Sequence, residues 1–244
     1  ADPVKAAAHV VALAIAGLAV YIAHAHFVER RAASELGPQG LGRQLGIGLL
    51  VGAGLYAACE GVLMAMGIYR ITGLNPLSTM LPAVGMAVSA GVFEEVLFRG
   101  VLFLSVEKWF GTWAALVVSS LVFGLSHLAN PQATLQGALF IAVEAGVLLG
   151  AAVALTRRLW LGIGFHVSWN YTQQAVFSGV VSGNEAQPGW IRSTIQGPEY
   201  LTGGQFGVEA SVLALVLCTS TGIVMLVMAH RRGLIVPPAW KRSG

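Results

Sequence analysis

Long apolar runs dominate the chain, and short polar, glycine-rich or proline-rich stretches separate them. The runs are continuously apolar and lack the alternation of barrel strands, and each approaches the roughly 20 residues that a membrane-spanning helix needs. Because lipid offers no hydrogen-bond partners to the backbone, such runs must form helices. The sequence predicts seven spans, at residues 4–28, 42–69, 78–106, 112–129, 133–156, 160–180 and 208–230.

The composition agrees with a membrane protein. Hydrophobic residues make up 56% of the 244 residues and charged residues only 10%, whereas about 25% of an average globular domain is charged. We therefore predict an all-α polytopic membrane protein with a single domain, residues 1–244. The polar stretch 181–207 is interpreted as an external loop, and it would raise the count to eight spans if it re-enters the membrane.

Basic residues flank the ends of the predicted spans, which argues against nucleic acid as a partner despite a net charge of +3. Because cytoplasmic loops of membrane proteins collect Lys and Arg, the count on each side predicts an external N-terminus and a cytoplasmic C-terminus. Three basic residues, Lys5, Arg70 and Arg192, fall on one side. The other side collects Arg30, Arg31, Arg43, Lys108, Arg157, Arg158, Arg231, Arg232, Lys241 and Arg242.

The predicted span 78–106 carries charged residues at Glu94, Glu95 and Arg99. Charges are costly in lipid and usually mark a functional site. The two glutamates point about 100° apart on a helix, whereas Glu95 and Arg99 are one turn apart and can form a buried ion pair. Glu94 is then free to face a wet cavity and act as a general base. A single glutamate could serve only helix packing, but this triplet favours a site.

Two further pairs have one-turn spacing. Phe123 and His127 allow the phenyl ring to pack against the imidazole, and His166 and Asn170 direct polar groups to a common point. A histidine and an asparagine amide can both donate hydrogen bonds to the oxyanion of a tetrahedral intermediate. The remaining histidines, like the cysteines Cys59 and Cys218, are given no catalytic role.

The trio EExxxR, FxxxH and HxxxN, in this order on successive apolar helices, resembles the CPBP family of intramembrane glutamic endopeptidases, which comprises CAAX proteases and bacteriocin-processing enzymes and is also called Abi. The resemblance covers about residues 78–180, a four-helix catalytic core. It implies hydrolysis of a peptide bond in a membrane-associated or lipidated protein or peptide. Glu94 with His127 would activate water, and His166 with Asn170 would stabilise the oxyanion. Glu95, Arg99 and Phe123 would give structural support.

The resemblance implies a glutamate-dependent enzyme without a cofactor. The spacing also differs from the His-Glu-x-x-His helix of zinc peptidases. Zinc held by Glu94, His127 and His166 is the alternative.

The positions of the candidate catalytic residues along their predicted spans lead to a further prediction. Glu94 lies near the middle of its span, whereas His127 lies at the outer end if 112–129 crosses the membrane completely. The groups share one level if that span stops short and the chain turns at Asn130 and Pro131 inside the protein. We expect the site to open toward the cytoplasm.

The expected partners are a membrane-anchored or lipidated substrate and the bilayer, and the expected location is a bacterial inner membrane. The alternatives are a noncatalytic immunity or scaffold protein and an ion-coupled carrier with relay sites at Glu60, Glu94, Glu95 and Glu144. A carrier predicts broken helices in repeated halves, and the sequence shows no such repeat. Glu60 and Glu144 are interpreted as helix-packing groups or as lining of a substrate path.

Overall fold

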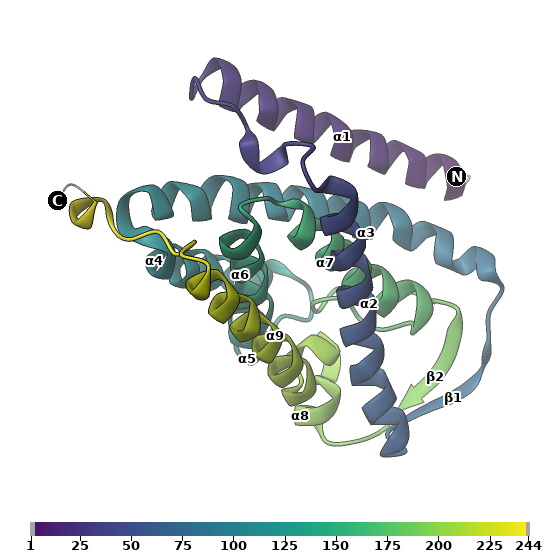
Figure 1. The fold of residues 1–244 in the computed structure, drawn as a ribbon. Coiled ribbons are helices and arrows are strands. Elements are labelled where there is room, and N and C mark those ends of the chain that lie inside the picture. Colours follow the sequence, from purple (N-terminus) through teal and green to yellow (C-terminus); the bar gives the residue numbers. More distant parts are fainter. Residues whose placement is uncertain (1–2, 243–244) are drawn as a thin grey trace.

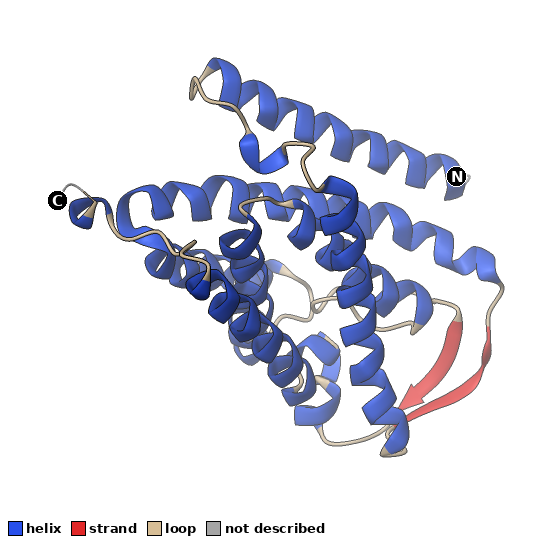
Figure 2. Cartoon of the chain, in the orientation of Figure 1, coloured by secondary structure: helices blue, strands red, loops and turns tan. Residues whose placement is uncertain are grey.

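The computed structural model describes residues 3–242 and is mostly helical (Figures 1 and 2). Three of the helical segments continue from an α-helix into a wider π-helical turn. The longer helical elements are α1 (Pro3–Phe27), α2 (Leu41–Ala65), α3 (Leu81–Glu94) with η3 (Glu95–Phe103), α4 (Leu104–Ser126), α5 (Leu135–Ile141) with η5 (Ala142–Gly146) and α6 (Val147–Thr156), α7 (Trp160–Tyr171) with η6 (Thr172–Val176), and α9 (Val212–Arg231).

Within the described residues, five segments are long and apolar enough to cross a membrane. They are Ala8–Phe27, Leu41–Ala65, Leu77–Ala129, Leu135–Thr156 and Val212–Arg231. This finding agrees with an integral membrane protein of the all-α class. The sixth predicted span, 160–180, corresponds to the 12 residues of α7 and the 5 residues of η6, which together form a shorter segment.

The segment Leu77–Ala129 contains two of the predicted spans, and it turns back on itself at Gly111 (Figure 1). Gly111 has a φ of 80° and a ψ of 171°, a conformation that only glycine adopts readily. A Cβ at this position would also lie 2.7 Å from the carbonyl oxygen of Val236 in the C-terminal tail. The break therefore returns the second arm of α4 along η3.

One small sheet departs from the predicted all-helical fold. The strand β1 (Tyr69–Leu74) pairs in antiparallel fashion with β2 (Ile191–Ile195), as Figure 2 shows. The predicted span 42–69 was too long because α2 ends at Ala65 and Gly67 follows with a φ of 71°, which ends the helix. The sheet ties the segment after α2 to the stretch 181–207.

Close contact between α2 and α7 positions two of the candidate site residues. A Cβ at Gly48 would lie 2.4 Å from the carbonyl oxygen of Leu161, and one at Gly52 would lie 2.3 Å from that of Phe165. Small residues let membrane helices approach this closely. The packing fixes the position of α7, which carries His166 and Asn170.

The stretch 181–207 packs against the rest of the protein. Val181, Ser182 and Phe206 are buried. The backbone N–H of Gln132 donates to the carbonyl of Gly183, and that of Gly183 donates to the carbonyl of Phe206. This part of the chain packs against the turn that follows α4, and none of the candidate membrane spans lies among its residues.

Candidate active site

The three motifs meet at one pocket of about 420 Å³ between α3, the end of α4, α7 and the segment after η6. Glu94, His127, His166 and Asn170 all line it. The remaining lining residues are Met86, Ser89, Ala90, Phe93, Phe98, Ser126, Asn130, Val181, Ser182 and Asn184. The shared level predicted for these groups is therefore present in the structure.

The two adjacent glutamates point to different surroundings, as their spacing predicts. Glu94 is the last residue of α3, and its side chain keeps 32% of its surface exposed at the pocket. Glu95 is the first residue of the π-helical turn η3 and is completely buried. Turns of this wider type recur at functional sites. One oxygen of Glu94, Oε2, is buried without a hydrogen-bond partner and lies 3.9 Å from Nε2 of His166.

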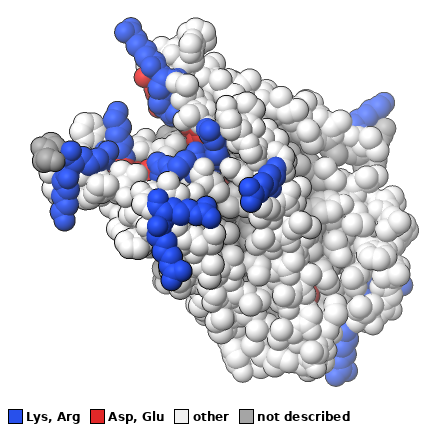
Figure 3. Space-filling model, viewed as in Figure 1, with Lys and Arg blue, Asp and Glu red and all other residues white. Residues whose placement is uncertain are grey.

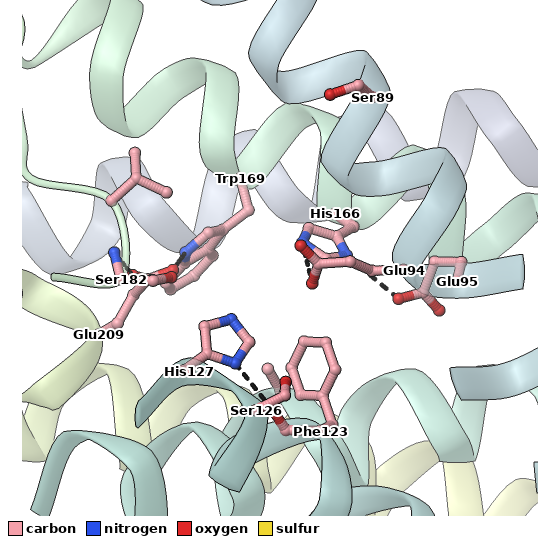
Figure 4. Close-up of polar contacts among 12 residues, drawn as sticks. Ser89, Glu94, Glu95, Phe123, Ser126, His127, His166, Trp169, Ser182 and Glu209 are labelled. Carbon is pink, nitrogen blue, oxygen red and sulfur yellow. Dashed lines mark hydrogen bonds and ion pairs between the residues drawn. The ribbon is translucent and has the colours of Figure 1, made fainter. Parts of the chain in front are cut away.

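Glu95 links two other motif residues. Its Oε1 accepts a hydrogen bond of 3.0 Å from Nη1 of Arg99. The same oxygen lies 3.1 Å from Nδ1 of His166 (Figure 4). The predicted ion pair with Arg99 is thus present, with both side chains fully buried. Arg99 also donates to the backbone carbonyl of Ala145 in η5. These contacts hold three helical segments around His166.

The ring of Phe123 lies at the centre of the network. The guanidinium of Arg99 lies 4.2 Å from its centroid, which is a cation–π contact. The ring of His127 packs edge-on at 4.9 Å, as the one-turn spacing predicts, and the ring of Phe98 packs at 5.1 Å. Phe123 therefore places the imidazole of His127 relative to η3.

His127 stands in a defined orientation at the end of α4. Its Nδ1 lies 2.8 Å from the carbonyl oxygen of Phe123 (Figure 4). A carbonyl can only accept, so Nδ1 carries the proton. In the neutral ring, Nε2 then carries a lone pair and is able to take a proton from a bound water. The turn beyond His127 is held by Asn130, whose side chain donates to the carbonyl of Ser182 at 2.7 Å.

Sequence reasoning missed a buried carboxylate, Glu209, which lies just before α9. Its Oε1 accepts a hydrogen bond of 3.0 Å from the indole of Trp169, the neighbour of Asn170. Its Oε2 accepts from the backbone N–H of Ser182 at 2.6 Å and from the hydroxyl of Ser182 at 2.8 Å. Figure 4 shows this carboxylate beside the pocket. The available signal was a glutamate at the start of a predicted span, 208–230, where charge is costly.

Glu60 and Glu144 lie outside the pocket that contains Glu94. Glu60 is buried and accepts a hydrogen bond of 2.9 Å from Tyr56 one turn away. Glu144, on η5, has a buried oxygen without a partner and lines a cavity of about 20 Å³ behind His127 and His166. Such a cavity has room for a single water molecule. Cys59 and Cys218 are buried and free.

Within residues 3–242, no group of three or more His, Cys, Asp and Glu side chains is arranged to hold a metal ion. Glu94, His127 and His166 line the same pocket without forming such a group.

The model of one protein family matches residues 76–172; it describes the type II CAAX prenyl endopeptidase Rce1-like family. This segment is similar to the Rce1-like family. The match contains all three motifs, so the resemblance predicted from EExxxR, FxxxH and HxxxN is confirmed. Neither a curated protein nor a solved structure matches the chain significantly.

The similarity of this segment to an endopeptidase family points to a protease. The segment ends before the loop that carries Ser182 and before Glu209. The part of the chain that follows the segment thus completes one wall of the pocket.

Proposed function

We propose that the protein is an intramembrane endopeptidase that uses Glu94 and His127 to activate water against a peptide bond of a membrane-associated or lipidated substrate. The observation that carries the proposal is the single pocket lined by Glu94, His127, His166 and Asn170. These groups come from three helices far apart in the sequence. Their convergence supplies a base, a second proton acceptor and hydrogen-bond donors around one space, as hydrolysis requires.

In the first step, a water molecule lies between the carboxylate of Glu94 and Nε2 of His127. One of its protons moves to this pair, and its oxygen forms a bond to the carbonyl carbon of the substrate. The carbonyl π electrons move to the oxygen and give a tetrahedral oxyanion. The C–N bond then breaks, and the proton held by the pair passes to the departing nitrogen. The products are a carboxyl group and an amine, without any oxidation or reduction.

His166 and Asn170 form the oxyanion site in this mechanism. The Asn170 amide donates a hydrogen bond directly. Nδ1 of His166 donates to Glu95, so Nε2 donates toward the pocket when the ring carries protons on both nitrogens. The nearby carboxylates of Glu94 and Glu95 would stabilise this charged form of the ring. Glu95 and Arg99 support the site by holding His166 and Phe123 in place.

The proposal includes a metal-free reaction, a bacterial inner membrane as the location and a substrate delivered by the bilayer. The charge asymmetry supports an external N-terminus and a cytoplasmic C-terminus. Hydrogen bonds occupy Nδ1 of both histidines, with Phe123 and Glu95 respectively, so Nε2 is the nitrogen of each ring that is available for the reaction.

The test is proteolysis by the purified protein in liposomes, with a panel of membrane-anchored peptides as substrates. Glu94→Gln and His127→Ala should each lower kcat by about 10²-fold to 10⁴-fold, and a metal chelator should leave the wild-type rate unchanged. Ser89→Ala, in the same pocket, is the matched control and should retain activity. Unchanged cleavage by both motif variants would refute the site, and inhibition by the chelator would point to the zinc alternative.

A further inference from the structure

The two ends of the molecule differ in charge. Figure 3 shows basic side chains gathered at the end where the C-terminus lies, with only a few at the opposite end. The segments at the basic end are joined by hydrogen bonds: Leu159 donates to Glu35, and Thr112 donates to Val236. An ion pair between Arg157 and Glu107 adds a further link. This end therefore unites the turns 28–40, 104–112, 157–159 and 232–242.

The opposite end unites a different set of segments. The sheet pairs the region of Arg70 with that of Arg192, and the turn after α4 is bonded to the loop after η6 through Asn130 and Ser182. The N-terminus also lies away from the basic end (Figure 1). Since cytoplasmic segments collect Lys and Arg, the basic end is the cytoplasmic one and this end faces outward.

The candidate active site belongs to the outer end. Its walls include His127, Asn130, Ser182 and Asn184, all of which come from turns or loops at this end. The lining residue Phe98 packs against the ring of Phe123 beneath the pocket wall.

Helix length agrees with this placement. The second arm of α4 runs from Thr112 to Ser126, which at about 1.5 Å per residue is roughly 22 Å, less than the hydrocarbon thickness of about 30 Å. The arm starts at the basic end, so His127 at its far end lies inside the outer half of the membrane. The chain then turns within the protein, as such turns require.

A second cavity of about 480 Å³ continues the pocket toward the outer loops. The two cavities share Met86, Val181 and Asn184. The second reaches the exposed Glu185 and Gln187, in the loop before β2. Among the described residues that line either cavity there is no Lys or Arg. The two adjoining cavities thus extend from Glu94 toward the exposed loop before β2.

We propose that the site opens to the non-cytoplasmic side of the membrane and that its substrate is a peptide segment presented from that side, next to a membrane anchor. The proposal rests on the proposed endopeptidase function and specifies its substrate class. It replaces the expectation of a site open to the cytoplasm, and it excludes a lipidated tail exposed only in the cytoplasm. The uncharged and acidic lining fits an uncharged or basic segment.

Cysteine labelling tests the orientation without relying on activity. Cys59 and Cys218 are buried, so single cysteines can be added to the full chain. Glu185→Cys marks the second cavity, and its matched control is Ser105→Cys, exposed near the basic end. A membrane-impermeant maleimide should label Glu185→Cys in intact cells and Ser105→Cys only in inverted vesicles. The reverse pattern overturns the proposal.

A second measurement tests the substrate class. The same cleavable segment is placed beside the membrane anchor of a single-span protein, either outside or in the cytoplasm. Wild-type protein should cleave the outer version at least about 10-fold faster, and preferential cleavage of the cytoplasmic version overturns the proposal. Absence of all cleavage would count against the endopeptidase function, whereas labelling would still decide the orientation. Fusion of a reporter to the C-terminus checks the same topology in the unsubstituted chain.

Discussion

Oε1 of Glu95 lies 3.1 Å from Nδ1 of His166, and the same oxygen accepts a hydrogen bond from Arg99. Both charged side chains of the ion pair are fully buried. One carboxylate oxygen therefore links the stability of the helices to the orientation of an imidazole in the pocket. These two roles can be separated by substitution.

Replacement of Glu95 by Gln should destabilise the protein, because it leaves Arg99 as a buried charge without its counterion. We expect a loss of about 3–5 kcal/mol in the free energy of unfolding, measured as denaturation in detergent. The double variant Glu95→Gln with Arg99→Met removes both charges and should recover much of that stability.

Proteolysis should respond differently. Cleavage should stay low in the double variant, because the charge beside Nδ1 of His166 is still missing. Recovery of activity together with stability would show that Glu95 acts only through the fold.

Replacement of Asn170 by Ala should lower kcat by about 10²-fold to 10³-fold, the usual cost of one oxyanion donor. KM should change little, because the hydrogen bond strengthens mainly in the transition state. Steady-state kinetics with a membrane-anchored peptide measures both constants. The matched control is Asn184→Ala, the same substitution at the rim of the same pocket. An equal loss of kcat in both variants would contradict the special role of Asn170.

Much of the site could be predicted because its geometry is local. The one-turn spacing of Glu95 and Arg99, and of Phe123 and His127, determines which side chains meet on a helix. The helices could be predicted from the apolar runs, because backbone N–H and C=O groups in lipid must form hydrogen bonds within their own segment. The ends of the spans were predicted less accurately, because α2 ends before Gly67, which lies inside the predicted span 42–69.

The remaining features depend on contacts between distant parts of the chain. Glu209 is 40 residues from Trp169, and the strand with Arg70 pairs with one more than 100 residues later. The periodicity of apolar and polar residues along a segment carries no information about such contacts. The proposed opening of the site toward the outer side is argued from the three-dimensional positions of Asn130 and Ser182, because depth along single spans gave no shared reference.

Substitution of Glu209 should impair activity although this residue does not line the pocket that contains Glu94. In Glu209→Gln, the new amide nitrogen meets donors on Trp169 or Ser182, so at least one hydrogen bond is lost. We expect a loss of about 1–3 kcal/mol in the free energy of unfolding and a higher KM, because the loop with Ser182 forms a wall of the pocket.

Two single changes separate the contacts of this carboxylate. Trp169→Phe removes only the indole donor, whereas Ser182→Ala removes the hydroxyl but keeps the backbone N–H. Each should have a smaller effect on KM than Glu209→Gln. A normal KM in Glu209→Gln, measured at a temperature where the variant is folded, would contradict a positioning role.

Neutral substitutions of Glu60 and Glu144 distinguish a protease from an ion-coupled carrier. Glu60 is bonded to Tyr56, and Glu144 has a buried oxygen without a partner, so a carboxamide of the same shape should be tolerated at each position. We expect Glu60→Gln and Glu144→Gln each to keep a rate of proteolysis within about 3-fold of the wild-type rate. A 3-fold change in rate corresponds to a change of only about 0.6 kcal/mol in the activation free energy. An ion-coupled carrier would instead require the charge of these two glutamates. If the variants fold normally but no longer support ion uptake into liposomes, the result would favour the carrier. Glu94→Gln, assayed in parallel, should abolish proteolysis and thereby show that the assay reports on the pocket.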